Sequence, residues 1–265
     1  MSGFVCREVL PGVFHIGDAM GVYMTLLVGE KRALLVDAGY GCGDARAFVR
    51  GITDRPIDLI LTHAHHDHAL GAMHFERAAL FAQDAAFLPV FTGTAQRARV
   101  AAQAKAKGIS LPSEYLTAPM ARIDPLEQGD IDLCGMTARI LLCPGHTPGS
   151  AVVFVPERKL LLTGDNWNPC TWLFFPEALG AKAYRANVRA LLALGFDSVL
   201  CSHREALYPR SELEAFLAGL TDEALRSARR VEMGWPVDTR EAAPAPGQVF
   251  VFDRDKAALC GGEDA

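Results

Sequence analysis

The stretch Thr62-His63-Ala64-His65-His66-Asp67-His68 places a cluster of potential metal ligands directly after an apolar run, residues 57–61, that reads as a buried strand. In an extended chain the side chains of residues i and i+2 point the same way, so His63 and His65 can approach one metal together. Asp67 and His68 follow where the chain turns into a helix-like segment, and they can face a second metal. A histidine-rich polar loop is the alternative, but its position at a strand end argues against it.

Three further candidate ligands follow downstream strands. His146 stands between two apolar runs, residues 138–142 and 151–155, and a turn at 156–159 leads to a third run, 160–163, and then to Asp165. The runs 151–155 and 160–163 should form an antiparallel hairpin, which brings His146 and Asp165 to the same sheet edge. His203 ends another short strand, residues 198–202. Each residue alone is an ordinary loop residue, but in this order coincidence is a poor explanation.

This ordered set of ligands resembles that of the metallo-β-lactamase-fold hydrolase superfamily. The resemblance implies a four-layer αββα sandwich with a dinuclear site along one edge. It assigns His63, His65 and His146 to the first metal and Asp67, His68 and His203 to the second, with Asp165 bridging both. The bridging aspartate is typical of the glyoxalase II-like, lactonase-like and phosphodiesterase-like branches, whereas the antibiotic-degrading members commonly have cysteine or serine there. Asp37 resembles the first acidic motif position and would orient the histidine-rich loop; its alternative is an ordinary turn residue after a strand.

The chemistry of these ligands predicts a hydrolase that is not a true β-lactamase. Imidazole nitrogen and carboxylate oxygen suit two divalent ions, zinc first, with iron or manganese as alternatives. A hydroxide that bridges two metals can attack the carbonyl of a carboxyl ester, thioester or lactone, and Asp67 can act as a catalytic residue by orienting it or accepting its proton. A phosphodiesterase that uses the same site, or an iron-dependent redox or non-hydrolytic protein, stays open.

The composition is that of a soluble enzyme with one domain over residues 1–265. The chain has 50% hydrophobic residues, no signal segment and no apolar run long enough to span a membrane. Seven cysteines without framework spacing predict reduced thiols and a cytoplasmic location. A net charge of -5 argues against nucleic-acid binding. The basic cluster Arg226-Ser227-Ala228-Arg229-Arg230 reads as a solvated helix face.

The remaining pattern predicts the following elements. Strands are expected at 5–10, 13–16, 23–28 and 33–36, and helices at 44–50, 182–194 and 211–230, the last broken near Gly219 with Thr221 or Asp222 as a new cap. Residues 84–125 read as a helical and loop insertion that either covers the active site or packs outside. Residues 240–247 look like a Pro/Ala linker, and 248–252 like an edge strand.

An aromatic segment, residues 166–176, begins next to Asp165. Pro169 and Pro176 exclude a simple strand, and Trp167, Trp172 and Phe174 can form a pocket wall for a small-molecule substrate with an apolar or aromatic part. The alternatives are packing under a loop or a subunit contact, which leaves a homodimer open.

Overall fold

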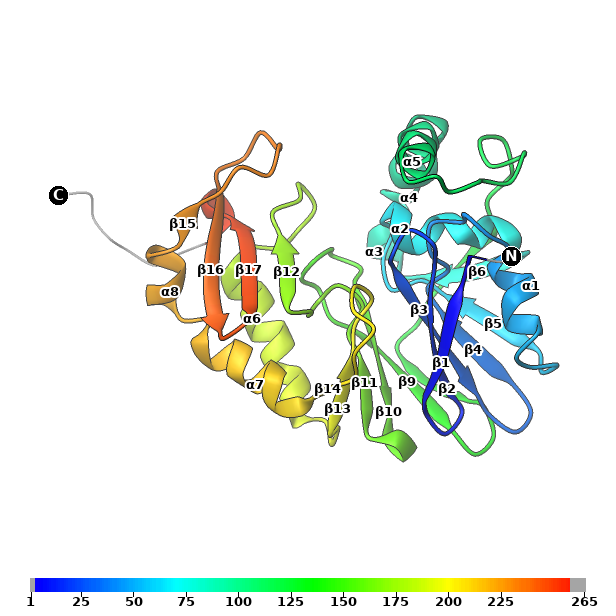
Figure 1. Ribbon diagram of the computed structural model, residues 1–265. Coiled ribbons are helices and arrows are strands. Elements are labelled where there is room, and N and C mark those ends of the chain that lie inside the picture. Colours follow the sequence, from blue (N-terminus) through cyan, green and yellow to red (C-terminus); the bar gives the residue numbers. More distant parts are fainter. Residues whose placement is uncertain (1–2, 258–265) are drawn as a thin grey trace.

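A computed structural model describes residues 3–257, and three β-sheets organise them (Figure 1). The first sheet contains, in spatial order, β1 (Val5–Leu10), β2 (Val13–Gly17), β3 (Tyr23–Val28), β4 (Ala33–Val36), β5 (Ile57–Ile60), β6 (Arg77–Leu80) and β7 (Arg122–Pro125). The second contains β14 (Tyr208–Pro209), β13 (Ser198–Leu200), β11 (Leu160–Leu162), β10 (Ala151–Val155), β9 (Thr137–Leu142) and β8 (Gly129–Asp132). The third contains β12 (Cys170–Leu173), β17 (Gln248–Asp253), β16 (Thr239–Ala245) and β15 (Arg229–Arg230).

Helices cover the faces of the first and second sheets that point away from each other. They are α1 (Ala45–Arg50), α2 (His66–Ala69), α3 (Ala82–Ala85), α4 (Leu88–Thr92), α5 (Thr94–Ala106), α6 (Ala181–Ala190), α7 (Arg210–Gly219) and α8 (Asp222–Arg226). Short 3-10 turns are η1 (Leu70–His74), η2 (Pro156–Arg158), η3 (Leu191–Ala193) and η4 (Arg254–Lys256). Thr221 caps α8 by accepting a hydrogen bond from Ala224 N, as the sequence predicts.

Successive side chains along a strand point to opposite faces of its sheet and so pack in different layers of the fold. In β4, Leu34 faces the second sheet, whereas Leu35 packs on the other side with α1. In β10, Val153 faces the first sheet, whereas Phe154 packs with α6 and α7. Because both strands are covered on both faces, they are apolar throughout. The predicted four-layer αββα arrangement is confirmed.

The end of the chain differs from its prediction. Residues 239–245 form β16 instead of a linker, and β17 lies between β12 and β16 instead of at an edge. Ala245 pairs with Gln248, so Pro246 and Gly247 form a tight turn, with φ of 73° at Gly247. Pro244 lies where the pairing of β16 with β17 shifts register, and it lies beyond the residues of β16 that pair with β15. Neither neighbouring strand needs a hydrogen bond from a backbone N–H at this position, so a proline is tolerated there. The proline-rich composition therefore conceals a hairpin.

Other differences are local. The pair Arg229 and Arg230 lies in β15 and not in a helix, although both side chains are exposed and ion-paired. Within the aromatic segment, the two prolines flank a short strand, β12. The stretch 84–125 begins inside α3 and ends in β7, so its last four residues belong to the first sheet.

All cysteines of the described part are free, and Cys260 lies outside it. Among the described helices, none is long and apolar enough to cross a membrane.

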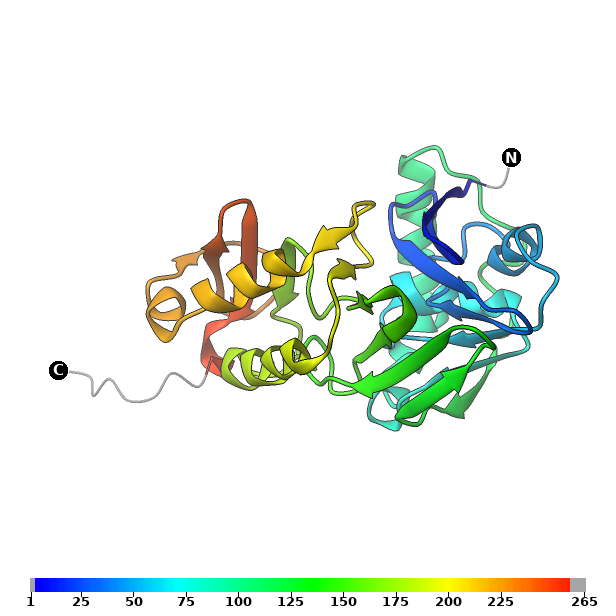
Figure 2. The ribbon, with the colours of Figure 1, turned by 90° about the horizontal axis from the view of Figure 1, so that it is seen from below.

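The third sheet packs closely against the helices that cover the second sheet, on the side away from the first (Figure 2). Phe250 of β17 lies in the same apolar cluster as Phe216 of α7. A Cβ atom on Gly219, at the end of α7, would lie 1.7 Å from the carbonyl oxygen of Pro244 in β16. This close approach requires glycine.

We expect Gly219→Ala to lower the free energy of unfolding by about 1–3 kcal/mol, because α7 and β16 must separate to admit the methyl group. Gly195→Ala is the matched control, since a Cβ atom there meets nothing within 4 Å, and its effect should stay within about 0.5 kcal/mol. Urea denaturation of both variants measures the difference. Equal midpoints for Gly219→Ala and the wild type would contradict the packing described.

Candidate metal centre

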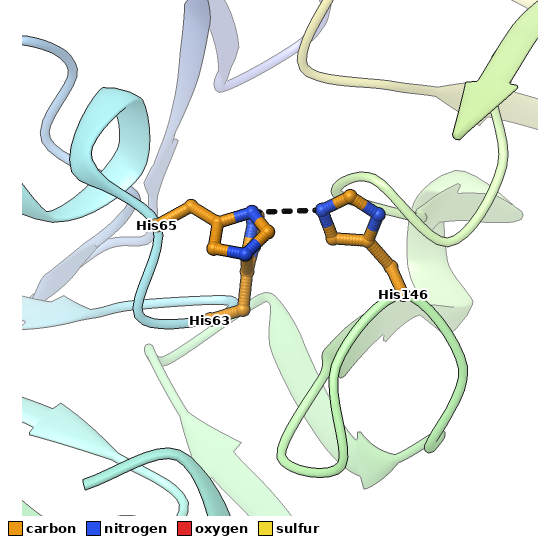
Figure 3. A group of neighbouring side chains, drawn as sticks. All are labelled: His63, His65 and His146. Atoms are coloured by element: carbon orange, nitrogen blue, oxygen red, sulfur yellow. Dashed lines mark hydrogen bonds between the residues drawn. The ribbon is translucent and has the colours of Figure 1, made fainter. Parts of the chain in front are cut away.

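Three buried histidines converge at the first position. His63 and His65 follow β5 at the start of α2, and His146 comes from the loop between β9 and β10 (Figure 3). Nδ1 of His65 lies 2.9 Å from Nε2 of His146, and the ring centroid of His63 lies 4.6 Å and 4.8 Å from theirs. His146 follows His65 by about 80 residues in the sequence. The three side chains come together because the strands that carry them end at the same edge.

Two carboxylates and two histidines form the adjacent group: Asp67, His68, Asp165 and His203. Nε2 of His203 lies 3.0 Å from Asp165 Oδ2 and 3.5 Å from Asp67 Oδ2. Nε2 of His68 lies 3.4 Å from Asp165 Oδ1. Asp165 Oδ2 is also 3.6 Å from His146 Nε2, so this carboxylate stands between the two groups.

Partners outside the centre orient four of the imidazoles. Nδ1 of His146 donates to the carbonyl of Trp172 at 2.7 Å, and Nδ1 of His68 donates to Asp37 at 2.8 Å. Since carbonyls and carboxylates only accept, both rings carry hydrogen on Nδ1 and direct Nε2 inward. Nδ1 of His63 lies 3.0 Å from the hydroxyl of Thr62, which donates to Asp37, so this ring also points Nε2 inward.

His65 is oriented the other way round. Its Nε2 lies 2.5 Å from Glu177 Oε1, which leaves Nδ1 to face His146. Two nitrogen lone pairs 2.9 Å apart repel each other unless a cation lies between them. The inward atoms His63 Nε2, His68 Nε2 and Asp165 Oδ1 are buried and have no hydrogen-bond partner. These nitrogen and oxygen donors therefore fit divalent metal ions.

The charges of the two groups differ. Burial, reinforced by the neighbouring imidazoles, holds the pKa of His63 well below its ordinary value, and burial lowers the pKa of His146 to about 4. Burial opposes protonation of His68 as well, but the nearby carboxylates, Asp165 first, raise its pKa well above the ordinary value. Burial also opposes ionisation of Asp165, yet His203 and His68 hold its pKa well below the usual range. The first group offers neutral lone pairs, whereas the second pairs its ionised carboxylate Asp165 with a protonated His68, whose proton a metal ion would displace.

Asp37 lies where the sequence places it, at the end of β4. Its carboxylate accepts hydrogen bonds from the backbone N–H of Thr62 at 2.7 Å, from the hydroxyl of Thr62 and from His68. Its φ of 67° is uncommon for a residue other than glycine. It thus contacts both the start of the histidine-rich loop and one ligand of the second group.

Asp84 is a site residue that sequence reasoning missed. Its buried carboxylate accepts hydrogen bonds from the backbone N–H groups of Ala64 and Gly149 and from the hydroxyl of Thr147. It therefore joins the loop of His63 and His65 to the loop of His146. The sequence shows only an aspartate near the start of a helical stretch, which carries no ligand pattern.

Of the three aromatic residues that the sequence singles out, two are buried and one is exposed. Trp167 has 0% exposure and packs in the core against Tyr208, so it offers no surface to a pocket, and Phe174 is also buried. Trp172 is 41% exposed. Phe175, which sequence reasoning missed, lies 5.0 Å from His65 and 5.4 Å from His146 between ring centroids.

Two more missed rings extend this surface. Phe91 of α4 lies 4.5 Å from the ring of His65, so the segment 84–125 reaches the centre through this helix. Trp235, which is 42% exposed, lies 5.4 Å from Phe175. We call Phe91, Trp172, Phe175 and Trp235 the aromatic rim.

The comparisons agree with this geometry. Residues 17–203 match the family model of the metallo-beta-lactamase superfamily. The chain is 28% identical to an acyl-coenzyme A thioesterase from Gallus gallus over 62% of its own length, and it spans 66% of that relative. It is also 28% identical to a hydroxyacylglutathione hydrolase from Haemophilus influenzae, with 72% of this chain and 80% of that one covered.

Solved structures show the same fold at low identity. A sec-alkylsulfatase from Pseudomonas sp. superposes with a TM-score of 0.61 at 17% identity, over 84% of this chain and 41% of that one. A metallo-beta-lactamase from Pontibacter korlensis gives a TM-score of 0.56 at 16% identity, over 82% of this chain and 98% of that one. From its family match, the chain belongs to the metallo-β-lactamase superfamily.

Proposed function

We propose that the protein is a dinuclear metal-dependent hydrolase that cleaves a carboxyl ester, thioester or lactone with an apolar or aromatic acyl part. The observation that carries this proposal is the position of Asp165 between the two groups of buried ligand atoms. Its Oδ1 faces His68 of the second group, and its Oδ2 lies near both His146 of the first group and His203 of the second, so this carboxylate can hold two cations close together.

We assign the following roles to the residues of the centre. His63, His65 and His146 would hold one ion, Asp67, His68 and His203 the other, and Asp165 both. Two divalent ions, zinc best suited to these donors, would supply a water of lowered pKa and polarise the carbonyl oxygen of the substrate. Asp67 is almost buried, and its Oδ2 lies 3.5 Å from Nε2 of both His68 and His203. We assign to it the orientation of the attacking water and the acceptance of its proton.

The aromatic rim supports an apolar acyl group. Phe91 and Phe175 contact His65 from different elements, α4 and the loop after β12, so an acyl chain can lie against both rings while its carbonyl reaches the ligands. Two of the relatives are named as hydrolysing an acyl-coenzyme A thioester and a hydroxyacylglutathione. The free cysteines of the described part fit a reducing cytoplasm.

The direct test combines metal quantification with a substrate panel. Purified protein should contain about two zinc ions per chain and should hydrolyse acyl thioesters, carboxyl esters or lactones faster than matched phosphodiesters. Bound iron together with oxygen consumption would contradict the proposal, and so would a preference for phosphodiesters.

Asp165→Ala and His203→Ala should each reduce the metal content to about one ion per chain and lower kcat/KM at least about 100-fold, because the second ion loses ligands and its charge stabilisation is lost. Elemental analysis and steady-state kinetics measure both effects. Asp197→Ala is the control, since Asp197 forms only an exposed ion pair with Lys159 among the ion pairs described. Two ions and full turnover in Asp165→Ala would refute the assignment.

Trp172→Ala and Trp235→Ala should each lower kcat/KM about 3- to 10-fold for an aryl or long-chain acyl substrate and leave an acetyl substrate nearly unchanged, because a ring contact is worth about 0.5–1.5 kcal/mol. The ratio of the two specificity constants is the measurement. Val5→Ala serves as the control, because Val5 is a strongly exposed apolar residue of β1. An equal loss for both substrates would mean that the rim does not select the acyl part.

A further inference from the structure

Glu177 is a buried acidic residue that the proposed hydrolysis does not use. It lies in the loop between β12 and α6, and its side chain is 6% exposed, as is that of His65. Its Oε1 lies 2.5 Å from Nε2 of His65. A carboxylate buried to this degree is costly unless a charged or strongly polar partner compensates it, and His65 is that partner.

The contact lies on the far side of the imidazole from the metal centre. Nε2 of His65 faces Glu177, whereas Nδ1 faces Nε2 of His146 at 2.9 Å. Because the carboxylate only accepts, it keeps hydrogen on Nε2 and a lone pair on Nδ1. Glu177 therefore cannot bind the same ion through this oxygen, and it acts on the centre only through His65.

In each ligand group, one histidine has a carboxylate on its outward nitrogen. Asp37 binds the outward nitrogen of His68 in the second group, as Glu177 binds that of His65 in the first. The outward partners of His63 and His146 are a hydroxyl group and a carbonyl group. A carboxylate makes an imidazole a stronger donor than a neutral acceptor does, so one histidine in each group is strengthened.

A lysine from the end of the described chain holds the loop of Glu177. Nζ of Lys256, in η4, donates to the carbonyl oxygens of Phe175 at 3.1 Å, Pro176 at 2.5 Å and Ala178 at 3.2 Å. These carbonyls stand on both sides of Glu177 in sequence. The ammonium group thus clamps the loop in the conformation that directs Glu177 toward His65.

We propose that Glu177 is a positioning residue for His65, and that Lys256 holds it in place, so that metal affinity in the first group depends on the C-terminal part of the fold. The inference rests on the proposed metal centre. Glu177 fixes the tautomer and the ring orientation of His65 and strengthens Nδ1 as a donor. Lys256 acts one step further away, by ordering the loop.

The test measures cobalt(II) binding to the metal-free protein, followed by the visible absorption of the bound ion. The His203→Ala background isolates the first group. In this background Glu177→Gln should weaken cobalt binding about 10- to 100-fold and change the intensity or position of the bands. Glu177→Ala, which loses the hydrogen bond entirely, should weaken it further. Lys256→Met should act in the same direction by a smaller factor.

Glu157→Gln is the matched control, because Glu157 also accepts hydrogen bonds but from Thr137, at the opposite end of the second sheet. Its binding curve and spectrum should superimpose on the parent. If Glu177→Gln lowers the melting temperature of the metal-free protein, Lys256→Met, which leaves His65 and its carboxylate intact, becomes the deciding variant.

Two outcomes overturn the inference in different ways. Cobalt affinities and spectra that match the parent in Glu177→Gln, Glu177→Ala and Lys256→Met would remove the role of Glu177 and leave the metal centre standing. Failure of the protein without any substitution to bind cobalt would instead refute the centre itself and the proposed hydrolysis with it.

Discussion

The carboxylate of Asp37 is the constraint on which the centre depends. It binds the backbone and the hydroxyl of Thr62, which fixes the path of the chain as it leaves β5, and it binds the outward nitrogen of His68. The hydroxyl of Thr62 in turn receives the N–H of His63. One carboxylate therefore orients a histidine in each ligand group. It also holds an uncommon positive φ, a cost that these charge-assisted hydrogen bonds offset.

All three sheets contribute to the same small volume. The first sheet delivers His63 and His65 at the end of β5, the second delivers Asp165 after β11, and β12 of the third provides the carbonyl that holds His146. Asp84 joins two of the loops through hydrogen bonds from Ala64 and Gly149. Three inward atoms, His63 Nε2, His68 Nε2 and Asp165 Oδ1, are buried without a hydrogen-bond partner, so the centre holds polar atoms that cations can use.

The convergence of the candidate ligands could be predicted from sequence because each follows a strand whose apolar pattern is local. The run before His63 and the hairpin before Asp165 need no knowledge of distant residues. Glu177 and Asp84 could not be predicted this way, because their roles arise from contacts with residues far away in the chain. The orientations of Trp167 and Phe175 could not be predicted either. Both residues lie near Asp165 in sequence, but the sequence does not tell which ring faces the core and which faces the centre. β16 was concealed by composition, as Pro244 stands where a strand tolerates it.

The pairing of β12 with β17 determines when the centre can be completed during synthesis of the chain. Trp172, whose carbonyl orients His146, pairs in parallel with Val251, and among the described strands only β17 lies beside β12 in its sheet. All the candidate ligands leave the ribosome well before Val251 does. Until β17 emerges, β12 has no neighbour in its sheet, and His146 has no fixed acceptor. The centre is therefore complete only after Val251, which follows every candidate ligand in the chain, has been translated.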